Sequence, residues 1–95
     1  MSIRSQNADQ PTNVTFKNVS PSTVRLFWHS YEGELEEYAV LNPGETYDVD
    51  TFVTHPWSAV DVNSGSRVPI NNGNEFYPRP QNETVYIGKY ENNFF

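Results

Sequence analysis

The chain of 95 residues contains no cysteine, one methionine, and only six lysine and arginine residues. Without cysteine, disulfide bonds, thiolate catalysis and cysteine-ligated zinc sites are excluded. Twelve acidic residues give a formal net charge of −6, which argues against binding nucleic acid or an anionic membrane because both need clustered basic side chains. No apolar run approaches the roughly 20 residues that span a bilayer, and the N-terminal sequence MSIRSQNADQ lacks the apolar stretch of a signal peptide. We therefore expect a soluble protein of the cytoplasm, with a nuclear location also open.

Aromatic side chains are abundant instead, at 15% of the residues within a hydrophobic total of only 36%. The remaining composition is rich in Val, Thr, Asn, Pro and Gly, which favour strands and turns over helices. The length suits a single domain with one modest core. These features predict an all-β fold and exclude a helical bundle.

Short stretches of alternating apolar and polar residues recur roughly every ten residues, separated by turns rich in Asn, Ser, Pro and Gly. The expected strands are 13–17, 24–28, 36–40, 45–52, 57–62, 66–70, 75–77 and 84–87. The pattern predicts that the first two of these strands form a hairpin closed by the turn around Pro21. Seven to eight short strands predict an antiparallel β-sandwich over residues 13–95, preceded by a flexible polar arm over residues 1–12. The expected core residues are Phe16, Leu26, Val49, Val60, Ile70, Val85 and Ile87.

Metal binding and catalysis have little support in the sequence. His29 and His55 could share a metal ion with Asp48 or Asp50, but their spacing fits no metal-binding motif. The acidic run over residues 32–37 is most simply a solvated loop, and no phosphate-binding loop or catalytic triad pattern is present. We therefore expect no enzymatic activity, no metal ion and no other cofactor.

One segment is chemically distinctive, because Thr51, His55 and Trp57 bring a hydroxyl, an imidazole and an indole together beside the turn-forming Pro56. These side chains could fold around a small pocket. From the residues alone, the simpler interpretation is that Trp57 is a core residue, His55 a surface loop residue and Thr51 an ordinary strand residue.

A longer series of residues, from about residue 13 to residue 90, shares its order and spacing with a known family. The series comprises Asn18-Val-Ser-Pro21, Trp28, Tyr31-Glu32-Gly33-Glu34, Tyr38, Leu41-Asn-Pro43-Gly44, Thr51, His55, Trp57, Asp61 and Phe76-Tyr-Pro78. In these residues the chain resembles the β-domain of the von Hippel-Lindau tumour suppressor family. The resemblance implies a β-sandwich that captures 4-hydroxyproline in an extended peptide of the hypoxia-inducible transcription factor, and the strand spacing independently predicts the same fold.

The resemblance also implies roles for individual residues. Trp57 would pack against the hydroxyproline ring, and Thr51 and His55 would hydrogen-bond the prolyl hydroxyl. Tyr38 would contact the peptide backbone, and Trp28 would complete the aromatic wall. The expected partner is therefore a prolyl-hydroxylated peptide or protein.

The chain also departs from the family pattern. Thr51 stands where the family has serine, while Asp50 and Phe52 replace a histidine and a tyrosine at positions expected to contact peptide residues beside the hydroxyproline. The sequence stops at Phe95, where the family continues into a helical domain that docks elongin C and thereby a cullin ubiquitin ligase. We therefore expect that this chain does not dock elongin C. We expect a monomer that binds hydroxyproline-containing peptides without a further domain.

Two other classes of function stay open. A carbohydrate-binding β-sandwich could use Trp28, Tyr31, Tyr38 and Trp57 as a platform on which sugar rings stack. In an interaction domain with a degenerate pocket, the same aromatic residues would only build the core. For a peptide reader, the acidic residues around the expected pocket predict a preference for neutral or basic peptides.

Overall fold

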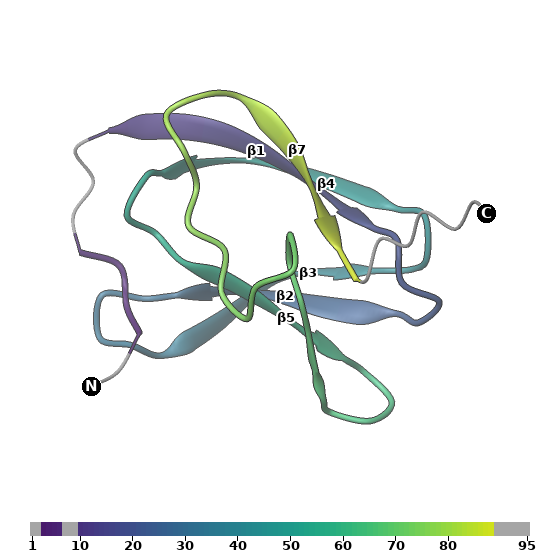
Figure 1. Ribbon diagram of the computed structural model, residues 1–95. Helices are drawn as coiled ribbons and strands as arrows, with labels where there is room; N and C mark the ends of the chain where they lie inside the picture. The colour runs from purple at the N-terminus through teal and green to yellow at the C-terminus, as the bar shows by residue number, and fades with distance from the viewer. Residues whose placement is uncertain (1–2, 7–9, 89–95) are drawn as a thin grey trace.

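Seven strands in two sheets make up the part of the chain that the computed structural model describes, residues 3–6 and 10–88 (Figure 1). The strands are β1 (Pro11–Asn18), β2 (Val24–His29), β3 (Leu35–Leu41), β4 (Thr46–Phe52), β5 (Trp57–Asp61), β6 (Arg67–Val68) and β7 (Glu83–Ile87). One sheet has the order β4-β1-β7 and the other β3-β2-β5-β6. This arrangement confirms the predicted all-β sandwich. Within the described residues, no helix is long and apolar enough to cross a membrane.

Alternation of side chains along the strands builds the core between the two sheets. In β1, Val14 and Phe16 are buried while Lys17 is exposed, and in β7 Val85 and Ile87 are buried on the same principle. The buried apolar residues are Val14, Phe16, Val24, Leu26, Leu41, Trp57, Ala59, Ile70, Phe76, Val85 and Ile87. Most of the predicted core is therefore confirmed.

Two predicted core residues are less buried than expected. Val49 is partly buried and packs against the core from β4. Val60 is also only partly buried, since it alternates with Ala59, whose side chain takes the inward position on β5. The prediction of Val60 as a core residue is therefore wrong.

The predicted hairpin of the first two strands is wrong, because β1 and β2 lie in different sheets. The buried side chain of Asn18 directs the chain across the sandwich. Its amide nitrogen donates to the carbonyls of Ser22 (2.8 Å) and Leu41 (2.9 Å), and its oxygen accepts from the backbone N–H of Ser20 (2.9 Å). These hydrogen bonds tie the end of β1 to the end of β3 and stabilise a connection that passes from one sheet to the other.

Three further details differ from the sequence prediction. β7 pairs with β1 in parallel, because it follows a long connection that crosses back from the other sheet, so the sandwich is not wholly antiparallel. β6 ends before Pro69, which has no N–H to donate to a ladder. Instead of a strand over 75–77, Phe76 forms a single bridge to Trp57, with backbone hydrogen bonds of 2.8 and 2.9 Å.

The segment predicted as an arm over residues 1–12 contributes to the fold in its described part. Pro11 and Thr12 belong to β1 and pair with β4. Ser5 is only 2% exposed, and its backbone N–H donates to the carbonyls of His29 and Ser30, at 3.2 Å each. Residues 1–2 and 7–9 of the arm, and 89–95 of the predicted domain, lie outside the described residues.

Candidate functional site

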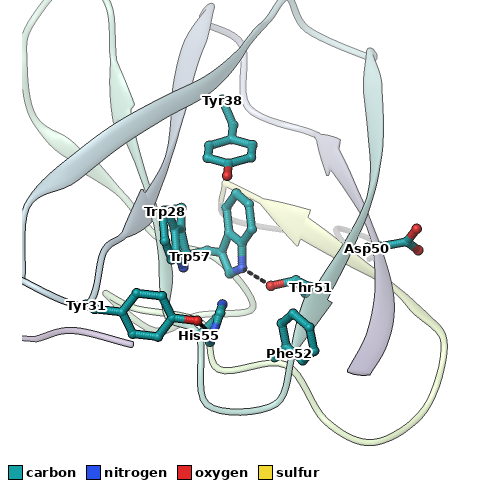
Figure 2. A pocket seen from close by; sticks show the side chains of 8 residues that line it. All are labelled: Trp28, Tyr31, Tyr38, Asp50, Thr51, Phe52, His55 and Trp57. Atoms are coloured by element: carbon teal, nitrogen blue, oxygen red, sulfur yellow. Dashed lines mark hydrogen bonds between the residues drawn. The ribbon is translucent and has the colours of Figure 1, made fainter. Parts of the chain in front are cut away.

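A cavity of about 160 Å³ opens beside β3 and β4, each of which lies at one edge of its sheet (Figure 2). Its lining residues are Trp28, Tyr31, Tyr38, Asp50, Thr51, Phe52, His55 and Trp57. Apolar cavities of about 150 Å³ hold a benzene-sized molecule, so this cavity has room for one small ring. The structure brings together all seven residues named from the sequence and adds Tyr31.

Trp57 lies at the boundary between the cavity and the core. It begins β5, is 2% exposed, and its ring centroid is 5.3 Å from that of Phe16. Its indole N–H donates to Oγ1 of Thr51 at 3.3 Å (Figure 2). Trp57 is therefore a core residue, as the simpler interpretation has it, and it also lines the cavity.

Trp28 forms a wall of the cavity from the neighbouring strand. It is the register partner of Trp57 in the β2–β5 pair, so the two indoles lie on the same face of the sheet. Its ring contacts Tyr31, Tyr38 and His55, with centroid distances of 5.7, 6.1 and 5.5 Å. Trp28 thus contacts three of the other rings that line the cavity.

A β-bulge directs Tyr38 toward the cavity. In the β2–β3 pair, Leu26 faces Ala39 and Phe27 faces Glu37, so Tyr38 is an extra residue between two register partners. Simple alternation would place its side chain opposite to that of Ala39, away from the two indoles. Instead, its ring lies 5.1 Å from Trp57, with the hydroxyl pointing toward that indole (Figure 2).

Thr51 and His55 supply the polar groups of the cavity. Thr51 is 4% exposed near the end of β4, and His55 is 5% exposed in the loop that follows. The backbone N–H of His55 donates to the carbonyl of Phe52 at 3.0 Å, and this turn brings the imidazole back to the cavity. His55 is therefore not the surface loop residue of the simpler interpretation.

Tyr31 is the lining residue that the site prediction missed. Its hydroxyl lies within hydrogen-bonding distance of Nε2 of His55, at 3.1 Å, and its ring packs edge to face against both His55 and Trp28. Ser30 holds the turn in place, because its backbone N–H donates to the carbonyl of Glu34 at 2.8 Å. Tyr31 was part of the motif that carried the family resemblance, but no spacing rule links it to a histidine 24 residues later.

Negative charge borders the cavity. Asp50 is exposed at its edge with its side chain pointing away from the cavity (Figure 2), and its carboxylate accepts a hydrogen bond from the side-chain amide of Asn13 at 3.1 Å. The same amide donates to Asp48 at 2.7 Å. Partial burial, followed by the nearby carboxylate of Glu36, raises the pKa of Tyr38, so its phenol stays neutral and able to donate. No lysine or arginine is among the lining residues.

The two histidines do not form a metal site. His29 is 5% exposed and its Nε2 lies 2.9 Å from the hydroxyl of Ser58, whereas His55 lines the cavity. Over residues 3–6 and 10–88, no three His, Asp or Glu side chains are placed to hold a metal ion.

Comparison with known proteins identifies the family of the chain. Residues 3–84 match the family model described as the VHL beta domain. The chain is also similar to Protein Vhl of Drosophila melanogaster, with 32% identity over 65 residues. That alignment covers 68% of this chain and 36% of the relative, so the chain spans little more than a third of the relative's length. The family match includes every residue that lines the cavity.

Proposed function

The chain belongs to the VHL beta-domain family, and from this membership and the cavity we propose that it is a substrate-recognition module that binds 4-hydroxyproline in an extended peptide. One observation carries the proposal: a hydroxyl, an imidazole and aromatic walls converge on a cavity with room for a single ring. These groups belong to Trp28, Tyr38, Thr51, His55 and Trp57. The proposed role is binding and involves no chemical step.

The aromatic walls suit the pyrrolidine ring of proline. This ring is a compact apolar plate, and an indole or phenol face can cover it. Trp57 would support the ring from the core side, with Trp28 and Tyr38 beside it. Burying such a ring contributes about 1 to 2 kcal/mol.

The two polar groups suit the 4-hydroxyl. Oγ1 of Thr51 accepts the indole N–H of Trp57, which leaves its own O–H to donate to the oxygen of the prolyl hydroxyl. His55 would accept the proton of that hydroxyl on an imidazole nitrogen, in place of one of its present partners such as the Tyr31 hydroxyl, which lies 3.1 Å from Nε2. Unmodified proline would bury the O–H of Thr51 without offering it an acceptor, at about 1 to 3 kcal/mol. Discrimination between the two peptides would come mainly from this penalty.

The position of the cavity suits an extended peptide. β3 and β4 each lie at the edge of a sheet and flank the cavity, so both offer unpaired backbone groups to a further strand. The fixed φ angle of proline keeps a peptide extended at that residue. Asp50 at the cavity edge would favour a basic peptide residue beside the hydroxyproline.

Titration calorimetry with two peptides that differ only in 4-hydroxylation tests the proposal. We expect the hydroxylated peptide to bind at least about tenfold more tightly, which corresponds to one unpaired buried group. Equal affinity for the two peptides, or no binding of either, would refute the proposed function.

A sugar-binding platform has weaker support. Tyr31 and Tyr38 are 42% and 44% exposed, as stacking on a sugar requires, but Trp57 is only 2% exposed. The aromatic residues therefore enclose a small cavity rather than form an open strip. An oligosaccharide screen against the same protein sample separates this alternative from peptide binding.

The remaining predictions concern the location of the protein in the cell, its oligomeric state and its partners. Cytoplasmic or nuclear location, a monomeric state and the absence of elongin C docking stay predictions. Fractionation, sedimentation and a pull-down with purified elongin C test them one by one.

A further inference from the structure

Ser5 connects the N-terminal segment to the wall of the cavity. Its hydroxyl accepts a hydrogen bond from the indole N–H of Trp28 at 2.7 Å and donates to the backbone carbonyl of His29 at 2.8 Å. Its backbone N–H donates to the carbonyls of His29 and Ser30. Since Ser5 is only 2% exposed, water has little access to replace these bonds.

The orientation of Trp28 depends on this contact. Trp28 is only partly buried and packs edge to face against Tyr31 and Tyr38, with interplanar angles of 86° and 78°. Its plane is tilted by only 31° from that of His55. These ring contacts are short-ranged and depend on how the indole is rotated. Among the described residues, the bond to Ser5 is the one hydrogen bond of the Trp28 indole, and it favours the rotation that forms the wall.

His29, which accepts hydrogen bonds from Ser5, also holds the loop that contains His55. The backbone N–H of His29 donates to the carbonyl of Pro56 at 3.0 Å, while the carbonyl of His29 accepts from Ser5. The N-terminal segment and the loop next to His55 are therefore fastened to the same residue of β2. A shift of Ser5 would reach the cavity by both routes, through the indole of Trp28 and through the backbone of His29.

We propose that Ser5 is a positioning residue of the peptide-binding cavity, which it affects by holding the indole of Trp28 in its binding rotation. The inference rests on the proposed function for its effect on peptide affinity, but the hydrogen bond itself can be tested without a peptide. Ser5 belongs to the segment that the sequence predicts to be a flexible polar arm, so the proposal gives this segment a role in binding.

The first measurement uses the full chain and the substitution Ser5→Ala. With two tryptophans, an ¹⁵N-labelled sample gives two indole N–H signals, and Trp28→Phe identifies the one that belongs to Trp28. We expect Ser5→Ala to shift that signal and leave the Trp57 signal in place, while Gln6→Ala, at the exposed neighbouring position, shifts neither. A Trp28 signal unmoved by Ser5→Ala overturns the inference, whatever the peptides do.

The second measurement is a double-mutant cycle on the affinity for the hydroxylated peptide. Loss of one hydrogen bond predicts about three- to tenfold weaker binding for Ser5→Ala. In the Trp28→Phe background, which has no indole N–H, Ser5→Ala should have almost no further effect. An equal loss in both backgrounds would show that Ser5 acts without Trp28 and would contradict the proposal.

The controls separate this inference from the proposed function and from unfolding. If the unaltered chain binds neither peptide, the proposed function fails, while the indole signals still decide the contact between Ser5 and Trp28. Thermal melting reports whether Ser5→Ala is folded at the temperature of the titration. If Ser5→Ala is unfolded at that temperature, Trp28→Phe takes its place, because it removes the indole N–H and leaves Ser5 unchanged. It should weaken binding of the hydroxylated peptide by at least about three- to tenfold, and unchanged binding would refute the proposal.

Discussion

The closed core and the open cavity of this sandwich lie side by side, but they are built from different kinds of side chain. In the core, residues such as Val14, Leu26 and Val85 are fully buried and have no polar atoms beyond the backbone. Around the cavity, most side chains are aromatic, and several of them carry polar groups that are hydrogen-bonded. The Trp28 and Trp57 N–H groups, for example, donate to serine and threonine hydroxyls.

The difference shows which forces act in each region. Apolar burial stabilises the core without regard to direction, whereas hydrogen bonds hold the cavity side chains in defined orientations. Over the described residues, no buried side-chain nitrogen or oxygen lacks a hydrogen-bond partner. Substitutions in the core should therefore change mainly the free energy of unfolding, and substitutions of the polar groups around the cavity should change mainly ligand discrimination.

The largest effect is expected at Trp57, which belongs to both regions. Trp57→Ala leaves a cavity beside Phe16 and should lower the free energy of unfolding by about 3 to 5 kcal/mol. Trp28→Ala should cost less, because Trp28 is only partly buried and lies outside the main core. Urea denaturation followed by fluorescence or circular dichroism measures both values. Equal losses would mean that the core and the cavity wall form one region.

The next effect is at Thr51, where Thr51→Val replaces the hydroxyl with a methyl group of similar size. We expect preference for the hydroxylated peptide to fall by about tenfold or more, since one partner of the prolyl hydroxyl is lost. Stability should also fall, by about 1 to 3 kcal/mol, because the indole N–H of Trp57 loses its acceptor. Calorimetry with the paired peptides and urea denaturation give the two numbers.

Two threonine variants serve as controls for this prediction. Thr51→Ser keeps the hydroxyl and should keep the discrimination. Thr46→Val, at an exposed position on the same strand, should change neither quantity. Discrimination that survives in Thr51→Val would remove Thr51 from the proposed binding mechanism.

The fold was largely predictable from the sequence because it follows from local alternation. Val14 and Phe16 in β1, or Val85 and Ile87 in β7, are apolar at every second position, and this pattern alone indicates strands with one buried face. Strand pairing was less predictable. The assignment of β1 and β2 to separate sheets involves the buried side chain of Asn18, whose partners lie in the connection after β1 and at the end of β3.

The cavity was predictable only in part, and chiefly through the family resemblance. Thr51, His55 and Trp57 are close in sequence, so their convergence was a reasonable hypothesis from local spacing. Tyr31 and Ser5 reach the site through contacts between residues 23 or more positions apart. No periodicity encodes such contacts, because they depend on how the two sheets and the N-terminal segment pack.

A smaller effect is expected from pH, through the buried His29 on the far side of β2 from the indole of Trp28. Burial lowers its pKa, an effect partly opposed by a hydrogen bond with the Ile3 backbone; the charge of Arg67 also lowers it and that of Glu75 raises it. Because the folded-state pKa lies below the unfolded value of 6.5, the neutral form favours folding. This contribution is fully present above pH 6.5 and is lost as the pH falls through the folded-state pKa.

Urea denaturation at about pH 7.5 and about pH 5.5 tests this expectation, since histidine is the side chain that ordinarily titrates in this interval. His29→Gln cannot gain a proton in this interval. At about pH 7.5 it should be less stable than the unaltered chain, and its free energy of unfolding should change less between the two pH values. A change of the same size in both proteins would assign the pH dependence to another group.

The smallest effect is expected from Asp50, which is exposed and therefore screened by water and salt. Asp50→Asn should weaken binding of a hydroxylated peptide with a neighbouring lysine by a few fold at low salt, since exposed ion pairs contribute at most about 1 kcal/mol. A neutral peptide should bind both proteins equally. Glu45→Gln is the matched control, because Glu45 is exposed just before the opposite end of β4, beyond the screening distance of about 10 Å at 0.1 M salt. If the advantage of the lysine peptide persisted in Asp50→Asn, or did not decrease with added salt, the acidic edge of the cavity would have no part in selecting the peptide.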